Sequence, residues 1–134
     1  MILIDELDNS KLLLTRGDDG YVEVPIIRKT TDSTIRHNSF FTKYLVKPED
    51  KVTIQVRSEP VVDKETSRDD TFVFNGIIKV IKGIPVWYIS KEQSTIPVGT
   101  YYWDAQIELK NGLRCTYNSG KLEIMSEGTL WMIL

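Results

Sequence analysis

Cysteine and histidine are almost absent from this chain of 134 residues, which contains one of each, Cys115 and His37. A single cysteine cannot form an internal disulfide bond or a cysteine-based zinc site. We place Cys115 on the apolar face of a strand, as a buried and inert thiol. His37 lies in a polar segment that we interpret as a loop, where a solvated side chain fits better than a general base. We therefore expect no catalytic residues and no enzyme, although an enzyme would have only these two as nucleophile and base.

An excess of charge of one sign and long apolar runs are also missing. Seventeen lysines and arginines stand against nineteen aspartates and glutamates, for a formal charge of -2. A basic patch for nucleic acid or for an anionic membrane is therefore not expected, and neither is such a partner. No segment approaches the roughly 20 apolar residues of a spanning helix, and Met1–Ile4 is too short for a signal peptide. We expect a soluble protein made inside the cell.

Motifs for cofactors and metals are missing as well. The glycines are scattered singles that form no Walker or dinucleotide-binding pattern. Acidic residues gather near the N-terminus and within 63–70, but neither group has the spacing of an EF-hand, so solvated loop carboxylates are favoured over calcium ligands. Arg16-Gly17-Asp18 spells a tripeptide found in adhesion ligands, and a glycine-containing turn explains it more simply. We predict neither a cofactor nor a metal site.

What the chain does contain is strand alternation, most clearly from Pro97 to Gly112. Five residues of this run fall on an apolar face and five on a polar face, as the period of two requires: Tyr101, Trp103, Ala105, Ile107 and Leu109 against Tyr102, Asp104, Gln106, Glu108 and Lys110. Asn111-Gly112 tolerates positive φ, which predicts a two-residue type I′ hairpin turn. Leu113, Cys115 and Tyr117 then resume the alternation on the return strand.

Turn residues recur at short intervals along the whole chain, which is typical of an all-β sandwich or barrel. Between them we predict strands at Lys11–Thr15, Tyr21–Arg28, Lys51–Arg57, Thr71–Asn75, Ile77–Lys82, Val86–Ile89, Thr100–Lys110, Leu113–Asn118 and Lys121–Met125. Pro25 argues for an edge or a bulge in its strand. One short helix is predicted after Ser90, with Ser90 as N-cap and Gln93 completing a capping box.

Length and composition fit one domain over residues 1–134, since a chain of this size buries roughly two-thirds of its unfolded surface. Segment 29–47 is a long excursion that carries an extra strand or a short helix, and 61–70 is a charged loop. The apolar C-terminal end at 129–134 has to pack on its own domain or on a neighbour. We therefore name Leu130, Trp131, Met132, Ile133 and Leu134 as candidate partner contacts.

Aromatic residues offer a second kind of contact. Trp103 is assigned to the core, because its neighbours on the strand face are apolar. Tyr88 and Tyr102 are the candidate surface contacts, and Trp87 is a third aromatic that a sugar-binding surface would use. The alternative function is therefore a carbohydrate-binding β-sandwich module that uses exposed aromatics.

Four segments in order resemble small structural proteins of tailed bacteriophages and prophages. They are Leu14–Ile26, Lys47–Ile54, Pro97–Ile107 and Gly120–Ile124, each a turn followed by an alternating strand. The chain is similar to baseplate and tail proteins with an immunoglobulin-like β-sandwich, including the N-terminal domain of siphophage baseplate upper proteins. The likeness covers most of the chain. It implies an immunoglobulin-like antiparallel β-sandwich of about eight or nine strands with at most one short helix.

The resemblance also implies the function. It predicts a non-enzymatic structural component of a phage or prophage tail or baseplate, made in the bacterial cytoplasm and located in the virion. Partners would be other tail or baseplate proteins and further copies of this chain, joined through strand edges and apolar termini. Two departures from the family are the length of the segment 29–46 and the apolar end at 126–134, where relatives continue into a further module.

Overall fold

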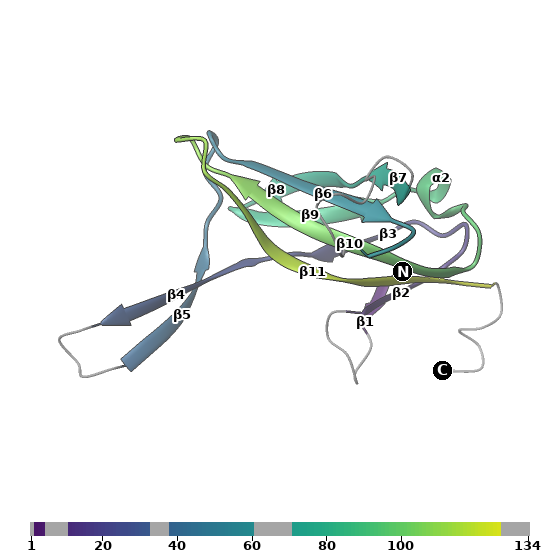
Figure 1. Ribbon diagram of the computed structural model, residues 1–134, viewed down its shortest axis with the longest axis horizontal. Coiled ribbons are helices and arrows are strands. Elements are labelled where there is room, and N and C mark those ends of the chain that lie inside the picture. Colours follow the sequence, from purple (N-terminus) through teal and green to yellow (C-terminus); the bar gives the residue numbers. More distant parts are fainter. Residues whose placement is uncertain (1, 5–10, 33–37, 61–70, 127–134) are drawn as a thin grey trace.

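The computed structural model describes residues 2–4, 11–32, 38–60 and 71–126. This part of the chain forms an all-β sandwich with one short helix, as the alternation predicts (Figure 1). The strands, in order, are β1 (Ile2–Ile4), β2 (Lys11–Thr15), β3 (Gly20–Glu23), β4 (Ile26–Asp32), β5 (Asn38–Tyr44), β6 (Lys51–Arg57), β7 (Phe72–Asn75), β8 (Ile77–Ile81), β9 (Ile84–Ile89), β10 (Gly99–Glu108) and β11 (Arg114–Met125).

Two sheets pack face to face. The large sheet has the strand order β1-β2-β11-β10-β6-β7, and the small sheet has the order β3-β9-β8. All pairs are antiparallel except β2 and β11, which run parallel, with Lys11 opposite Lys121 and Leu14 opposite Ile124. Strands from both ends of the described chain therefore lie side by side at one edge of the large sheet, with β1 and β2 from the N-terminal part and β11 from the C-terminal part.

The core lies between the two sheets and comes from the apolar faces that the sequence predicts. Its fully buried members include Leu14 on β2, Val56 on β6, Trp87 on β9 and Ala105 on β10. Trp87 and Trp103 contact each other across the sandwich, with ring centroids 5.5 Å apart. The polar residues of β10 between these positions remain on the outer face of the large sheet.

Gly76 marks the point at which the chain crosses from the large sheet to the small one, between β7 and β8. Its N–H donates to the carbonyl oxygen of Ile54 at 2.8 Å. A Cβ atom at this position would lie 2.9 Å from Cβ of Ile54 and 2.9 Å from Nε1 of Trp87. Only glycine lets the backbone cross this close to the core.

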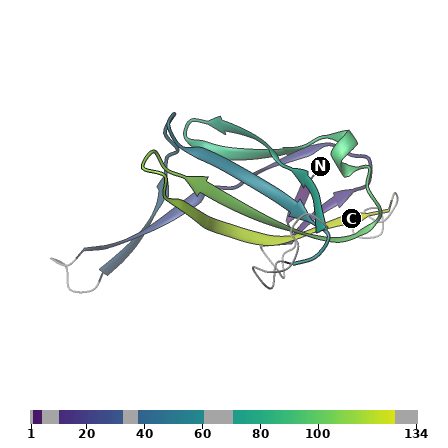
Figure 2. The ribbon, with the colours of Figure 1, turned by 45° about the horizontal axis from the view of Figure 1, so that its top comes forward.

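The segment 29–47 contains the extra strand that we expect. β4 and β5 pair with each other from Ile26 opposite Tyr44 to Asp32 opposite Asn38, and they form a two-stranded ribbon. Figures 1 and 2 show this ribbon, which we call the arm, projecting away from the sandwich. At its root, the hydroxyl of Tyr44 donates to Asp50 Oδ2 at 2.7 Å. This hydrogen bond, with one from the N–H of Lys47, lowers the pKa of Asp50.

The predicted turn at Asn111-Gly112 is of the wrong type. The N–H of Leu109 donates to the carbonyl oxygen of Leu113 at 2.8 Å, so three residues form the loop, and Gly112 alone among them has a positive φ, of 86°. The reason is local, because Oδ1 of Asn111 accepts the N–H of Leu113 at 3.0 Å. A two-residue hairpin with positive φ at both positions instead joins β8 and β9, at Lys82 (51°) and Gly83 (81°).

The division of the chain into strands differs from the sequence prediction in two places. The predicted strand Tyr21–Arg28 divides into β3 and β4, with Pro25 at the break between them. The two predicted strands at 113–118 and 121–125 are one strand, β11, because Gly120 lies opposite Trp103 within the ladder. A β-bulge interrupts the ladder: Ala105 pairs with Asn118 and Gln106 with Thr116, so Tyr117 is an extra residue.

The short helix α2 (Lys91–Ser94) has the predicted N-terminus. The Oγ of Ser90 accepts the N–H of Gln93 at 3.1 Å, and the Gln93 side chain accepts the N–H of Ser90 at 3.3 Å. Arg16-Gly17-Asp18 forms a turn beside this helix, where Gly17 has a φ of 86°. Nε of Arg16 donates to the carbonyl oxygen of Ile96 at 2.9 Å, which ties the tripeptide to the fold.

Candidate functional site

The candidate contact residues fall into three groups. Leu130, Trp131, Met132, Ile133 and Leu134 lie outside the described residues. Tyr88 and Tyr102 are half-buried, on the outer faces of the small and the large sheet respectively. Trp87 is fully buried, so its proposed use on a sugar-binding surface is wrong. Its place on β9 puts it on the inner face, against Trp103.

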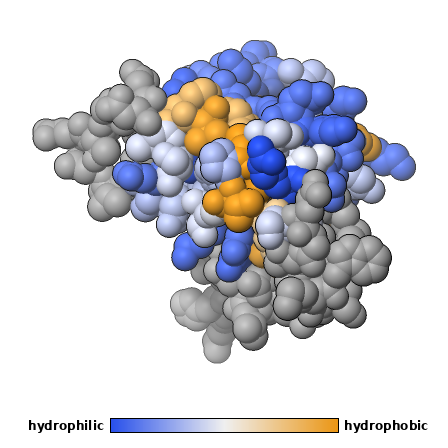
Figure 3. All heavy atoms as spheres, turned by 90° about the vertical axis from the view of Figure 1, so that its right-hand side faces the viewer, coloured by the Kyte–Doolittle hydropathy of each residue, from blue (hydrophilic) through white to orange (hydrophobic). Residues whose placement is uncertain are grey.

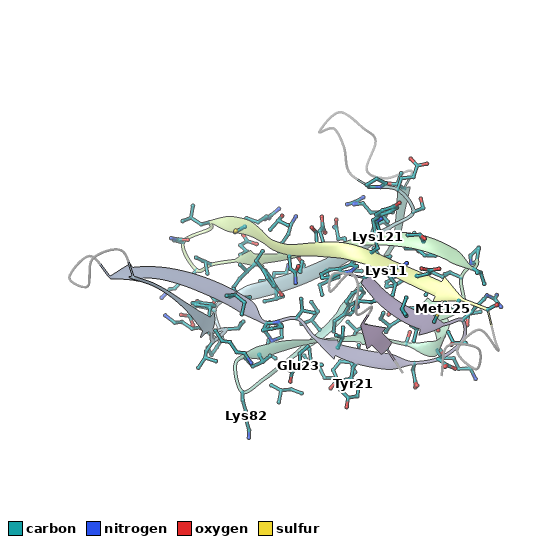
Figure 4. The ribbon with its side chains drawn as sticks, turned by 90° about the horizontal axis from the view of Figure 1, so that it is seen from below. Lys11, Tyr21, Glu23, Lys82, Lys121 and Met125 are labelled. Atoms are coloured by element: carbon teal, nitrogen blue, oxygen red, sulfur yellow. The ribbon has the colours of Figure 1, made fainter. Side chains whose placement is uncertain are left out.

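The outer face of the large sheet carries polar side chains around Tyr102, with the exposed Phe72 of β7 opposite Arg57. Tyr102 on β10 has Arg57 of β6 on one side and Lys121 of β11 on the other. In the next row of this face, Asp104 lies between Gln55 and Ser119 in the same three strands. Figure 4 shows Lys121 and Lys11 on neighbouring strands.

A hollow of about 430 Å³ opens on this face beside Tyr102, and we call it the Tyr102 hollow. Two basic and two acidic residues line it, with amide, hydroxyl and aromatic groups between them: Arg57, Lys121, Glu59, Asp104, Gln55, Thr116, Ser119 and Tyr102. Its central strand, β10, is paired on both sides, with β6 and with β11. On the far sides, β7 pairs with β6 at Gln55–Arg57 and β2 pairs with β11 at Lys121–Met125.

Arg57 is the most buried charged residue on this face, with 6% of its surface exposed. Its Nη2 donates to Oε1 of Gln55, two residues earlier on the same strand. Lys11 forms an ion pair with Glu123 at 2.8 Å, next to Lys121 on this face. The alternation of Lys51–Arg57 predicts that Gln55 and Arg57 share the polar face, but the order of the strands, which brings them to Tyr102, has no signal in the sequence.

The outer face of the small sheet carries a second aromatic group. The rings of Tyr21 and Tyr88 are 5.7 Å apart, and Nζ of Lys79 lies 5.1 Å from the centroid of the Tyr88 ring. Tyr21 is 66% exposed. Figure 4 shows Tyr21 and Glu23 pointing away from the sandwich, on the side opposite Lys121.

The last strand of the small sheet is apolar and exposed. β8 has the sequence Ile-Ile-Lys-Val-Ile, and among the described strands it pairs on one side only, with β9. Ile77, Val80 and Ile81 are 44%, 47% and 48% exposed. We call this strand the β8 edge. Such an edge is a template for pairing with another chain, and its one lysine gives little protection.

The end of the sandwich that carries α2 also shows apolar side chains, gathered in a band between hydrophilic ones (Figure 3). At this end the chain leads from α2 into β10 through Val98, which is 56% exposed. Together with the β8 edge, this band gives the described surface more than one apolar area. Apolar areas of this kind mark contacts with other proteins.

Cys115 is exposed, so its predicted burial is wrong. It shares a face with its ladder partner Ile107, as the alternation predicts. Both residues line an open hollow of about 400 Å³, together with Ile26 and Tyr44 from the root of the arm. His37 lies outside the described residues, so no geometry relates it to Cys115.

The part of the chain that the structure describes contains neither a metal cluster nor a membrane-spanning helix. The described residues contain no group of three or more histidine, cysteine, aspartate or glutamate side chains placed to hold a metal ion. Within them, no helix has the length and apolar character that crossing a membrane would require. The acidic residues at 63–70 lie outside this part.

The arrangement as a whole offers surfaces for binding: a hollow lined by an aromatic ring and by charged and hydroxyl groups, an apolar strand edge, an aromatic pair and a projecting arm. No protein-family model, curated protein or solved structure matches this chain.

Proposed function

We propose that this chain is a non-enzymatic structural component of a bacteriophage or prophage tail or baseplate. It assembles with further copies of itself and with other tail proteins through strand edges and its apolar end at 129–134. The resemblance of four sequence segments to such proteins motivates the proposal. The structural observation that carries it is the β8 edge, because an exposed apolar edge strand is a template for pairing with another chain.

The arm supports the same proposal. Among the described strands, β4 and β5 pair only with each other. A two-stranded ribbon by itself is marginally stable in water, since it has no sheet or helix to pack against. Figure 2 shows the arm projecting from its domain. In a tail particle, a neighbouring subunit would supply the support that the arm lacks.

The test is the molar mass of the full chain, measured by light scattering after size exclusion. We expect an oligomer, and we expect Ile81→Lys in the β8 edge or deletion of residues 129–134 to lower its mass. Leu113→Lys is the matched control, because Leu113 is 64% exposed but lies in the turn between β10 and β11. A strict monomer at high concentration, unchanged by the deletion, would contradict the proposal.

A carbohydrate-binding module is the second candidate, and one observation favours it. Tyr102 is one of the aromatics expected to contact a sugar, and it lines a hollow together with side chains that donate hydrogen bonds and side chains that accept them. A pocket with an aromatic wall and a few polar groups is a common form of small-ligand site.

A further inference from the structure

We propose that the Tyr102 hollow binds a neutral saccharide, with one sugar ring packed on the phenol ring of Tyr102. This site is separate from the β8 edge and from the arm, so it does not depend on the proposed assembly. It lies on the outer face of the large sheet, and its volume of about 430 Å³ suits one or two sugar rings.

The balance of charge selects the ligand class. Arg57 and Lys121 bring two positive charges to the hollow, and Glu59 and Asp104 bring two negative charges. A phosphate or an acidic peptide binds where cations are in excess, and a hard metal ion binds where carboxylates are in excess. In the Tyr102 hollow the cations and the carboxylates are equal in number. A neutral molecule is therefore the class of ligand that fits this lining best.

The hydrogen-bonding groups then narrow the class to polyhydroxylated molecules. A guanidinium and an ammonium group only donate, carboxylates only accept, and the hydroxyl groups of Thr116 and Ser119 do both. Each sugar hydroxyl also donates and accepts, so a ring that carries several of them can use donors and acceptors placed side by side. An apolar ligand would displace water from the exposed polar atoms of Glu59, Thr116, Ser119 and Lys121 without replacing its hydrogen bonds, at a cost of about 1–3 kcal/mol for each group that becomes buried.

The aromatic wall supplies the remaining contact. Tyr102 is half-buried, so part of its ring is available on the outer face between Arg57 and Lys121. The C–H groups of a sugar ring form an apolar surface that packs on an aromatic face, while the hydroxyl groups around the ring's edge reach the polar residues.

The site is also held rigid before any ligand binds. Arg57 is 6% exposed and donates to Gln55, which limits the positions of its guanidinium group. Trp103, the neighbour of Tyr102 on the inner face, is fixed in the core, and its Nε1 donates to the carbonyl oxygen of Lys121 at 3.3 Å. Side chains on central strands are placed more precisely than those on loops, so less entropy is lost on binding.

The test begins with the full chain on an array of neutral oligosaccharides built from glucose, galactose, rhamnose and N-acetylglucosamine, with anionic teichoic acid for comparison. The strongest neutral oligosaccharide is then titrated calorimetrically. We expect saturable binding that Tyr102→Ala weakens at least tenfold and that Asp104→Asn weakens by a smaller factor. Leu113→Ala is the control and leaves the affinity unchanged, because Leu113 is exposed in the turn between β10 and β11 and does not line the hollow. Tyr88→Ala tests the aromatic pair on the small sheet as the competing site. Circular dichroism checks that each variant is folded.

Backbone NMR spectra of the complex give a second readout. We expect shift changes at the amides of β6, β10 and β11 around Arg57, Tyr102 and Lys121. Three results would overturn the proposal: no neutral oligosaccharide bound, a preference for teichoic acid, or binding lost in Tyr88→Ala and kept in Tyr102→Ala. A monomer that binds sugar would refute the assembly alone, and an oligomer that binds none would refute this site alone.

Discussion

Trp87 on β9 and Trp103 on β10 contact each other across the interface between the two sheets, with ring planes tilted by 53°. Each is almost fully buried, at 0% and 5% exposed. Their neighbours along the strands, Tyr88 and Tyr102, point to the opposite faces. The pair therefore joins the two layers, and the same alternation presents the two tyrosines outside.

Replacing adjacent residues on β10 tests this alternation. Trp103→Ala removes a buried indole from the core and is expected to lower the free energy of unfolding by about 3–5 kcal/mol. Tyr102→Ala, one residue away on the outer face, is expected to cost less than about 1 kcal/mol. Urea denaturation measures both, and equal losses would show that the two side chains do not lie on different faces.

Gly76 provides a prediction about the crossing between the sheets. Gly76→Ala forces a methyl group against Ile54 and Trp87, and overpacking of this kind costs about 1–3 kcal/mol. Gly112→Asn is the control, since Gly112 has open space around it and asparagine tolerates its positive φ. Thermal denaturation should separate the two variants, and equal melting temperatures would argue against the close crossing.

Tyr117 makes stability depend on pH at the alkaline end. Burial raises the pKa of Tyr117 to about 12, and its hydroxyl donates to the carbonyl oxygen of Val24 at 3.0 Å. The unfolded state therefore loses this proton near pH 10, before the folded state does, and the contribution to stability falls between pH 10 and 12. We expect urea midpoints to fall more steeply over this range in the wild type than in Tyr117→Phe, and parallel curves would contradict the assignment.

Cys115 is expected to react in the native state. Because the thiol is exposed, a chromogenic disulfide reagent should modify one cysteine per chain without denaturant. Cys115→Ser gives the blank. A reaction that occurred only after unfolding would contradict this prediction, because it would show that the Cys115 thiol is buried in the native state.

Local signals in the sequence predicted much of the fold. The alternation gave the two faces of β10 and the bounds of β2 and β6, and Ser90 with Gln93 gave the start of α2. These succeed because each depends on residues close together in the chain. The turn at Asn111-Gly112 was predicted wrongly because the side chain of Asn111 also accepts the N–H of Leu113. This hydrogen bond selects a loop of three residues in place of two.

Other features depend on contacts between distant residues and have no local signal. Cys115 lies on the predicted face, yet it is exposed, because an open hollow lies over this end of the hairpin. Trp87 lies in a short strand whose sequence did not show which face is buried, and the strand order places it in the core. The Tyr102 hollow likewise needs β6 beside β10, on the side away from the predicted β10–β11 hairpin, and propensity and periodicity do not encode this neighbour.

The phage tail assignment is tested most directly in the particles themselves. The measurement is mass spectrometry of phage or tail particles purified from a bacterium that encodes this chain, after prophage induction and a density gradient. We expect the chain to sediment with the particles, at a copy number fixed relative to the other tail proteins and retained after a high-salt wash. Its presence only in the soluble cell fraction, with intact particles that lack it, would contradict the assignment.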